Sequence, residues 1–389
     1  MFKKFFRKTP LAWLQVTREK TRLTIALAGI AFADILMFVQ LGFMESLYDA
    51  AVKPHMNLDG DLFLINPQFE NLVAVKSFPR ERLYQAAGFD EVESINWMYI
   101  GTGEWRNPTT LINRSILIFG VDPATSTFTP ADINQQVDSL KLLNRAIFDR
   151  AGRPEYGDIQ TLLQQTNSLA VQVNDLDLQV AGIFTMGASF AADGNVIVSD
   201  STFLRLFPER EPEEIDVGLI HLKPGATIEQ VQATLQANLS SDVVVLTQEE
   251  FADREKAYWS SSTPIGFVFG FGAVIGFIVG TVIVYQILYS DVSDHLPEYA
   301  TLKAMGYSDS HLVGILIQEA LILAFLGFIP GGLLSIGLYH LAYASTLLPI
   351  FMTTNRAIMV LILTVLMCSA SGAIAMRKLQ AADPADIFQ

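Results

Sequence analysis

Four stretches of this chain are apolar over the length that an α-helix needs to cross a bilayer, which is roughly 20 residues. They are residues 23–46, 263–289, 312–344 and 357–376. Across all 389 residues, 51% are hydrophobic and only 17% are charged, which agrees with a membrane protein. The first stretch is too long for a cleaved signal peptide and holds Asp34 near its middle, so we expect an anchor. The sequence therefore predicts an α-helical protein with four transmembrane helices.

Charge is distributed very unevenly along the chain. Residues 47–262 carry 15 Lys and Arg against 30 Asp and Glu, a net charge of −15, while the whole chain has a net charge of −14. A large acidic domain is therefore expected between the first and second spans. Its negative charge argues against nucleic acid as a partner, because the phosphate backbone would be repelled.

Basic residues flank the first and last spans and predict the orientation of the chain. Seven Lys or Arg occur within residues 1–22, and Arg377 and Lys378 follow the last span. Loops rich in Lys and Arg stay on the cytoplasmic side of a membrane. We therefore expect an inner-membrane protein with both termini in the cytoplasm and residues 47–262 in the periplasm. The other segments follow by parity: 290–311 and 377–389 in the cytoplasm, and 345–356 as a short periplasmic loop.

The start of the chain has the composition of a helix that lies on a membrane surface. Aromatic and basic residues alternate there: Phe2, Lys3, Lys4, Phe5, Phe6, Arg7 and Lys8. Aromatic rings favour the interface, and basic side chains favour anionic lipids. We expect residues 1–22 to contain an interfacial helix in contact with membrane lipids, which is compatible with a simple orientation signal.

The acidic domain alternates segments that are typical of strands and of helices. Alternating apolar residues predict strands at 61–66, 93–105 and 110–122. Helices are expected within 79–89 and 133–150, and a hairpin is expected from strands 181–190 and 195–200 joined by a turn at 191–194. Residues 216–247 predict a strand, a turn at Pro224-Gly225, a helix with Thr227 as its N-cap, and a final strand.

These segments predict an extracytoplasmic α+β domain of two sub-lobes. The second sub-lobe is expected to form from an excursion of the chain around residues 122–172. Amphipathic helical segments at Glu45–Met56 and Gln248–Ser261 border the first and second spans. They could extend those spans outward as a stalk.

No pattern in the chain predicts a catalytic or metal site. His55 and His221 are isolated, Asp175 and Asp177 are typical of a solvated surface pair, and Cys368 is the single cysteine. The dipeptide Gly-Lys occurs nowhere, so the chain has no Walker A loop. We expect a chain that is not an enzyme and binds no cofactor, with any ATP bound by another chain.

Polar residues inside the first span are candidates for a role in mechanism. Asp34 and Gln40 interrupt that span, and a carboxylate near mid-bilayer is expensive unless it faces protein or water. Asp34 has three interpretations: a hydrogen bond to a neighbouring helix, an interface that moves during a transport cycle, or a proton relay. The relay is the weakest, because the nearest titratable candidates, Glu319 and His340, both lie on the third span.

Glycine and proline predict packing and bending of the second and third spans. Small residues four apart allow helices to approach closely. In the second span they are Gly266, Gly270, Gly272, Gly276 and Gly280. Whether the neighbouring helix belongs to the same chain or to a second copy is left open. In the third span Pro330, Gly331 and Gly332 predict a kink or break, with a tolerated bend preferred to a gate.

The loop between the second and third spans resembles a known family. Residues Glu298–Ala320 read EYATLKAMGYSDSHLVGILIQEA, which resembles the coupling segment of FtsX-like permeases, the superfamily of MacB, LolC and LolE. The ending RKLQAADPADIF and the layout of one span, a large domain and three spans resemble that family too. The segment Pro10–Ala50 is similar to the DevC type of permease in cyanobacterial DevBCA exporters, which likewise lacks a fused ATPase domain.

This resemblance implies a MacB-like (type VII) ABC permease that works by mechanotransmission. It implies a homodimer bound to an ABC ATPase subunit that holds ATP and Mg²⁺. A HlyD-type periplasmic adaptor and a TolC-like outer-membrane channel would complete a tripartite exporter of lipid, glycolipid or drug-like cargo. The expected ATPase-coupling residues are Pro297, Glu298, Tyr299, Ala300, Thr301, Leu302, Lys303, Ala304, Met305, Gly306 and Tyr307.

Three other functions remain open. FtsX itself regulates cell-wall hydrolases, so a regulatory scaffold is the first alternative. A lipoprotein-extracting permease similar to LolC and LolE is the second. A membrane-anchored enzyme is the third, and the lack of a catalytic pattern argues against it. The exported substrate cannot be deduced from these residues.

Overall fold

The structure is a computed structural model and describes residues 11–166, 168–189, 192–346 and 348–381. The expected interfacial segment Phe2–Lys8 and the end of the cytoplasmic tail lie outside these residues. The chain divides into two compact units. The helical unit is Met1–Ser46 with Ile265–Gln389, and the acidic unit is Leu47–Pro264.

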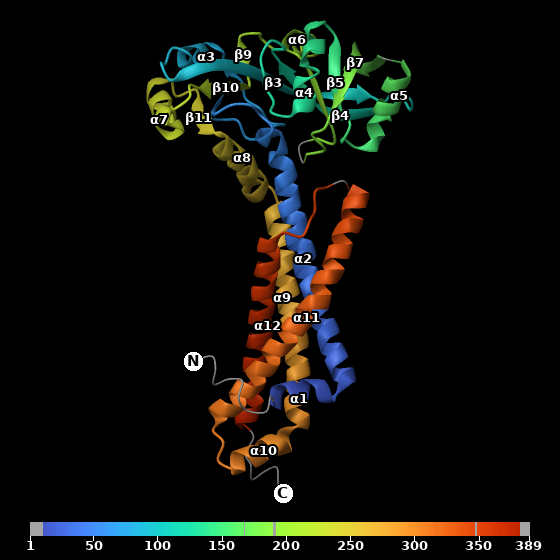
Figure 1. Cartoon of the computed structure of the whole chain (residues 1–389), viewed down its shortest axis with the longest axis vertical. Coiled ribbons are helices and arrows are strands. Elements are labelled where there is room, and N and C mark those ends of the chain that lie inside the picture. The colour runs from blue at the N-terminus through green and yellow to red at the C-terminus, as the bar shows by residue number, and fades with distance from the viewer. Residues whose placement is uncertain (1–10, 167, 190–191, 347, 382–389) are drawn as a thin grey trace. The chain divides into compact units, whose positions relative to one another are not determined.

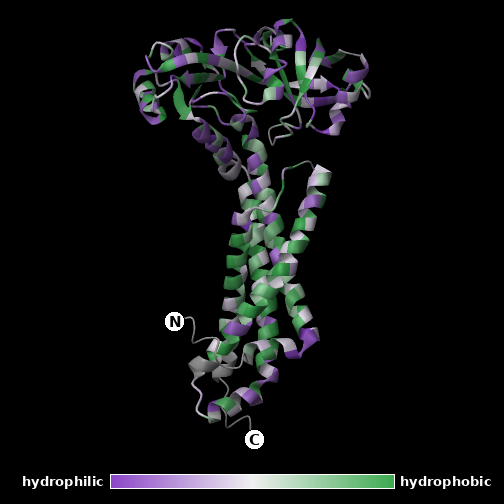
Figure 2. Cartoon of the chain, in the orientation of Figure 1, coloured by the Kyte–Doolittle hydropathy of each residue, from purple (hydrophilic) through white to green (hydrophobic). Residues whose placement is uncertain are grey.

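Long helices make up the described part of the helical unit (Figures 1 and 2). They are α2 (Lys20–Met56), α9 (Ile265–Asp294), α11 (Asp309–Thr346) and α12 (Thr354–Ala381), with the shorter α1 (Leu11–Arg18) and α10 (Leu296–Ala304). Four helices have the length and apolar composition needed to cross a membrane: Lys20–Met56, Ile265–Asp294, Val313–Thr346 and Thr354–Ala375. The expectation of four membrane helices is therefore confirmed. The end of α2 continues unbroken into the acidic unit.

The glycines of α9 pack against helices of the same chain. A side chain at Gly280 would lie 2.6 Å from Cβ of Ala33, which is on α2, and would also strike Met367 of α12. Gly276 approaches Leu36 and Met37 of α2 in the same way. The backbones of α9 and α2 can therefore come close together, as small residues permit in membranes.

The glycines of α9 are not all equivalent. Gly272 lies against the Gln40 side chain of α2, so it continues the packed row. A side chain at Gly270 would meet nothing within 4 Å. In this single chain, Gly272, Gly276 and Gly280 have neighbours on α2 or α12 of the same chain.

Strands and short helices build the described part of the acidic unit (Figure 1). The strands are β1 (Leu62–Ile65), β2 (Phe78–Pro79), β3 (Val92–Arg106), β4 (Asn113–Val121), β5 (Arg145–Asp149), β6 (Leu169–Val173), β7 (Leu176–Phe184), β8 (Asn195–Ser199), β9 (Glu214–Ile215), β10 (Val217–Leu222) and β11 (Val244–Thr247). The helices are α3 (Glu81–Ala86), α4 (Ala131–Asn134), α5 (Ile159–Thr166), α6 (Asp200–Leu206), α7 (Ile228–Asn238) and α8 (Gln248–Ala257). Tight 3₁₀ turns occur at Val137–Lys141 and Pro154–Tyr156, and a π-helical turn at Tyr258–Ser262.

A mixed sheet runs through the acidic unit in the order β11-β1-β10-β3-β4-β8-β5-β7-β6, and β2 pairs with β9 in a separate two-stranded sheet. Strand β3 is 15 residues long, and its first half pairs with β10 while its end pairs with β6 at Trp105 and Arg106. That last pairing closes the run from β3 to β6 into a ring of strands around Trp105 and its apolar neighbours. The two expected sub-lobes are therefore joined through β3, with α3 and α7 near one end of the sheet and α5 near the other (Figure 1).

Two local predictions in the excursion are wrong. Strands β7 and β8 do not form a hairpin, because β5 lies between them, parallel to β7 and antiparallel to β8. The expected helix at 133–150 contains only α4 and a 3₁₀ turn before the chain becomes β5. The buried side chains of Ala146 and Ile147 gain more from a place within the sheet than from continuing a short helix.

Candidate coupling site

The loop that resembles a coupling segment folds as helix α10 with a sharp C-terminal stop. Pro297 stands in its first turn, where a missing N–H costs nothing. At the other end the Tyr307 N–H donates to Leu302 O at 3.2 Å, and the Gly306 N–H donates to Lys303 O at 3.0 Å. This is a Schellman motif, and Gly306 has the positive φ of +93° that the motif requires. A glycine is needed there because other residues are strained at that angle.

Helix α10 has one face held by the helical unit and an apolar end that is exposed. Tyr299 is 2% exposed and packs in a cluster with residues of α1, α9 and α11, including Val16, Val292 and Leu316. In contrast Met305, just after α10, is 64% exposed, and Tyr307 is 43% exposed. An exposed methionine and tyrosine at the tip of an anchored helix are suited to docking on another protein.

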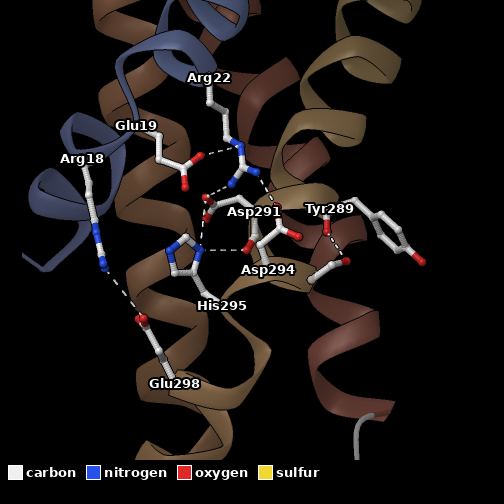
Figure 3. A network of polar contacts seen from close by, with 9 residues as sticks. Arg18, Glu19, Arg22, Tyr289, Asp291, Asp294, His295 and Glu298 are labelled. Carbon is white, nitrogen blue, oxygen red and sulfur yellow. Dashed lines mark hydrogen bonds and ion pairs between the residues drawn. The ribbon is translucent and has the colours of Figure 1, made fainter.

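A network of charged side chains ties α1, α2, α9 and α10 together (Figure 3). At its centre Arg22 donates from Nη1 to Asp291 Oδ1 at 3.1 Å, and its Nη2 forms an ion pair with Asp294. Glu19, between α1 and α2, lies 3.4 Å from Arg22 Nε. We call these residues, together with Arg18, His295 and Glu298, the Arg22 network.

The network reaches α10 through two further contacts. His295, directly before α10, has Nδ1 at 3.1 Å from the Asp291 backbone oxygen and 3.5 Å from its Oδ1. Arg18 of α1 lies 3.8 Å from Glu298 in the first turn of α10, but both side chains are well exposed and that pair contributes little. The start of α10 is therefore held mainly by the buried His295–Asp291 contact.

The Arg22–Asp291 pair is the strong contact of the network because Asp291 is buried. Its side chain is 8% exposed, whereas Asp294 is 54% exposed. Breaking a buried ion pair leaves one charge without a partner, which is strongly destabilising. Arg22, Asp291 and Glu319 of α11 also line a small cavity of about 20 Å³. The start of α2 and the end of α9 are therefore fastened next to the coupling segment.

Asp34, predicted as a polar residue inside the first span, has a partner in a neighbouring helix. Asp34 is fully buried, and the Thr364 hydroxyl of α12 donates to its Oδ1 at 2.5 Å. A side chain at Gly331 of α11 would lie 2.9 Å from Asp34 Cβ. Asp34 thus lies where α2, α11 and α12 meet. The interpretations of a moving interface and a proton relay stay predictions.

The third span is one continuous helix through Pro330, so it is not broken there. Gly331 permits the close approach to α2, while a side chain at Gly332 would meet nothing within 4 Å. The predicted kink stays a prediction.

A second charged pair, not predicted from the sequence, lies near the far end of the bundle from α10. Arg356 at the start of α12 is 5% exposed and donates from Nε to Glu45 Oε2 at 2.9 Å. Its Nη1 donates to Phe351 O at 2.8 Å, and its guanidinium lies 5.4 Å from the centre of the Tyr339 ring. In the sequence, the only signal for this pair was that Arg356 and Glu45 each lie near the end of a predicted span.

Among the described residues, no group of three or more His, Cys, Asp or Glu side chains could hold a metal ion. An open groove of about 640 Å³ on the acidic unit is lined by Glu104, Arg106, Asn113, Gln172, Asn174, Asp175 and Leu111. Most of these polar side chains already bond to one another across β3, β4 and the β6–β7 turn. The groove therefore does not resemble a prepared catalytic centre.

Comparison with known proteins finds a family model that matches the C-terminal part of the chain. Residues 267–384 match the family described as FtsX-like permease C-terminal. This range holds nearly all of α9 and the whole of α10, α11 and α12. No curated protein matches the chain.

Two solved structures are similar to part of the chain. The periplasmic region of MacB from Actinobacillus actinomycetemcomitans is 11% identical, with a TM-score of 0.35, and the match covers 50% of this chain and 91% of that one. The extracellular domain of the noncanonic ABC-type transporter YknZ from Gram-positive bacteria is 16% identical, with a TM-score of 0.32, covering 48% and 99%. The four long apolar helices and the unit of strands and short helices confirm the predicted fold class of a helical membrane protein with a large α+β domain. Residues 267–384, which include the segment 297–307, are similar to the family described as FtsX-like permease C-terminal.

Proposed function

We propose that this chain is the permease subunit of an ABC exporter whose ATPase is a separate chain. The observation that carries the proposal is the apolar tip of α10, Met305 and Tyr307, exposed on a helix that is anchored within an FtsX-like permease domain. A partner ATPase binds this tip. Movement of α10 then passes through Tyr299 and the Arg22 network to the ends of α2 and α9.

The proposal continues on the outer side of the membrane. Helix α2 carries Arg22 near its start, and its last ten residues, 47–56, belong to the acidic unit, so a shift at its base would pass along the helix to those residues. In a homodimer of the DevC type, this movement would press lipid, glycolipid or drug-like cargo in the periplasm into a HlyD-type adaptor and a TolC-like channel. The buried Asp34–Thr364 contact fits helices that move as packed bodies rather than a polar channel for cargo.

Purification of the full-length chain from native membranes tests this function. We expect an ABC ATPase, a periplasmic adaptor and an outer-membrane channel to co-purify with it. Recovery of the ATPase with a cell-wall hydrolase instead would favour a regulatory scaffold. Recovery with a lipoprotein carrier would favour a lipoprotein-extracting permease. Absence of any ATPase would contradict the proposal as a whole.

Cysteine labelling tests the orientation that the proposal requires. In a Cys368→Ala background, Leu142→Cys in the acidic unit and Met305→Cys after α10 each place one thiol at an exposed position. An impermeant maleimide should label the first in intact spheroplasts and the second only after lysis, because a charged reagent does not cross the bilayer. The reverse pattern would show that the acidic unit is cytoplasmic.

A further inference from the structure

Glu255 is a buried carboxylate at which three segments of the acidic unit meet. It lies in α8 and is 1% exposed. Its Oε1 accepts a hydrogen bond from Trp259 Nε1 at 2.7 Å, and its Oε2 accepts one from the Leu72 N–H at 3.1 Å. The third segment is the end of α2, where His55 Nε2 lies 3.6 Å from Glu255 Oε2. The carboxylate therefore contacts α8, the following π-helical turn, the loop 66–77 and α2.

His55 is placed by contacts that do not involve its ring nitrogens. The imidazole is 1% exposed and stands edge-on to Phe251 of α8, with ring centres 4.4 Å apart. The backbone oxygen of His55 accepts a hydrogen bond from Gln248 Nε2 at 3.2 Å, and the same amide donates to Leu58 O at 3.0 Å. Within the described chain, neither ring nitrogen has a hydrogen-bond partner. A shift of less than 1 Å would bring Nε2 within hydrogen-bond distance of Glu255.

Burial shifts the pKa values of both Glu255 and His55. Burial raises the pKa of Glu255 from 4.5 to about 7, against the lowering effect of its bonds to Trp259 and Leu72. Complete burial lowers the pKa of His55, which lies beyond the membrane-spanning part of α2, from 6.5 to about 3. Between about pH 4.5 and 6.5 the folded pair therefore holds one proton, on Glu255. In the same pH range the unfolded chain also holds one proton on these two residues, but on His55.

The charged side chains on the surrounding segments do not change the protonation of His55 and Glu255. Lys53 on α2, Glu70 on the loop and Arg254 on α8 are charged residues on the three segments that surround the pair. Arg254 donates to the backbone oxygens of Phe69 and Pro67. In the described part of the chain, none of the three forms an ion pair with His55 or Glu255. Arg254 instead adds a second connection between α8 and the loop.

A π-helical turn at Tyr258–Ser262 lies next to Glu255, between α8 and α9. Such turns are rare and occur frequently at functional sites. This one follows α8 directly, contains Trp259, and stands two residues before α9 begins at Ile265. The segments that lead toward the first and second spans are thus joined to each other at Glu255.

We propose that Glu255 is a positioning residue, with His55 as its proton-sharing partner, that fastens the end of α2, the α8–π-helix segment and the loop 66–77 into one junction. The inference rests on the proposed function, in which both chain connections to the membrane carry movement. With the junction intact, the end of α2 and the α8–π-helix segment move together. Without it, each connection acts on a separate part of the acidic unit.

The first test measures unfolding of the full-length chain in detergent by tryptophan fluorescence, since Trp97, Trp105 and Trp259 all lie in the acidic unit. Four proteins are compared with the pH varied from 4.5 to 6.5: wild type, His55→Leu, Glu255→Leu and the double variant. In His55→Leu the remaining group is Glu255, whose pKa is raised in the folded state. Such a group stabilises the fold most at low pH, so the unfolding midpoint of this variant should fall by about 5 °C as the pH rises. A group with a lowered pKa behaves oppositely, so the midpoint of Glu255→Leu should rise. Wild type and the double variant should follow the same shallow profile.

The second test measures amide hydrogen exchange of Leu72, which reports the position of the loop. Glu255→Gln keeps the side-chain volume but places an amide nitrogen against a donor, so we expect Leu72 to exchange at least tenfold faster. Asp253→Leu, on an exposed position of α8, is the matched control and should leave the exchange unchanged. Parallel pH profiles for all four proteins, or unchanged exchange in Glu255→Gln, would overturn the proposal. Neither measurement depends on an ATPase partner, so failure here is distinct from failure of the proposed function.

Discussion

Met305→Glu is expected to abolish stimulation of the partner ATPase while leaving the permease folded. Met305 is 64% exposed just beyond α10, so the new carboxylate would be solvated in the free chain. In a docked complex it would be buried without a partner. Loss of a central apolar contact costs roughly 2 kcal/mol or more, about 30-fold in affinity, and a buried unpaired charge adds to that cost. The ATPase rate of the reconstituted complex, measured against permease concentration, gives both affinity and maximal stimulation.

The matched control for this variant is Leu142→Glu. Leu142 is 57% exposed and lies in the acidic unit, so the chemical change is the same and the exposure is similar. On the proposed topology this variant should stimulate the ATPase as wild type does. Normal stimulation by Met305→Glu would show that the tip of α10 is not the docking surface. An equal loss in both variants would point to a general effect of added charge.

Gly280→Leu is expected to disrupt the packing of the helical unit. A Cβ at this position would lie 2.6 Å from Ala33 Cβ and would also strike Met367, and a leucine adds three more carbons. Overpacking of this kind costs about 1–3 kcal/mol, and more where the backbone must separate. The added volume should push α9 away from α2 and α12. We therefore expect a fall in the thermal midpoint of the helical unit and weaker transmission through α9.

Cys368 allows this effect to be measured on the helical unit alone. It is the single cysteine of the chain and is fully buried in α12, so a fluorogenic maleimide reacts with it only after that unit opens. Gly270→Leu is the matched control: the same substitution on the same helix, where a side chain would meet nothing within 4 Å. Gly270→Leu should keep the wild-type midpoint. Equal midpoints for the two variants would contradict the packing assigned to Gly280.

The sequence predicted well those features that depend on a few neighbouring residues. Strands β1, β3 and β4, helix α3, and the strand–helix–strand run that ends at Thr247 are all present where they were expected. Alternation of apolar side chains and turn residues such as Pro224 are local signals. Thr227 does precede α7, although its hydroxyl does not cap that helix.

Predictions failed where the order of strands decided the outcome. The predicted strands 181–190 and 195–200 looked like a hairpin because only the four residues 191–194 separate them. Asp149, at the end of β5, instead accepts hydrogen bonds from the Met186 and Gly187 N–H groups and from the Asn195 side chain. Those bonds hold β5 between the two strands. A strand from an earlier part of the chain cannot be inferred from the residues of the turn alone.

The sequence by itself determined the four membrane helices, the large acidic domain and the lack of a nucleotide-binding loop. Each depends on local composition: a helix of about 20 apolar residues satisfies its own backbone hydrogen bonds in a bilayer, whatever surrounds it. Only the tertiary structure decided that Arg22 meets Asp291, that Arg356 meets Glu45 and that His55 meets Glu255. The members of each pair lie far apart in the chain, so only the whole fold brings them together. The four spans that identified a membrane protein thus became a connected set of helices once these partners were known.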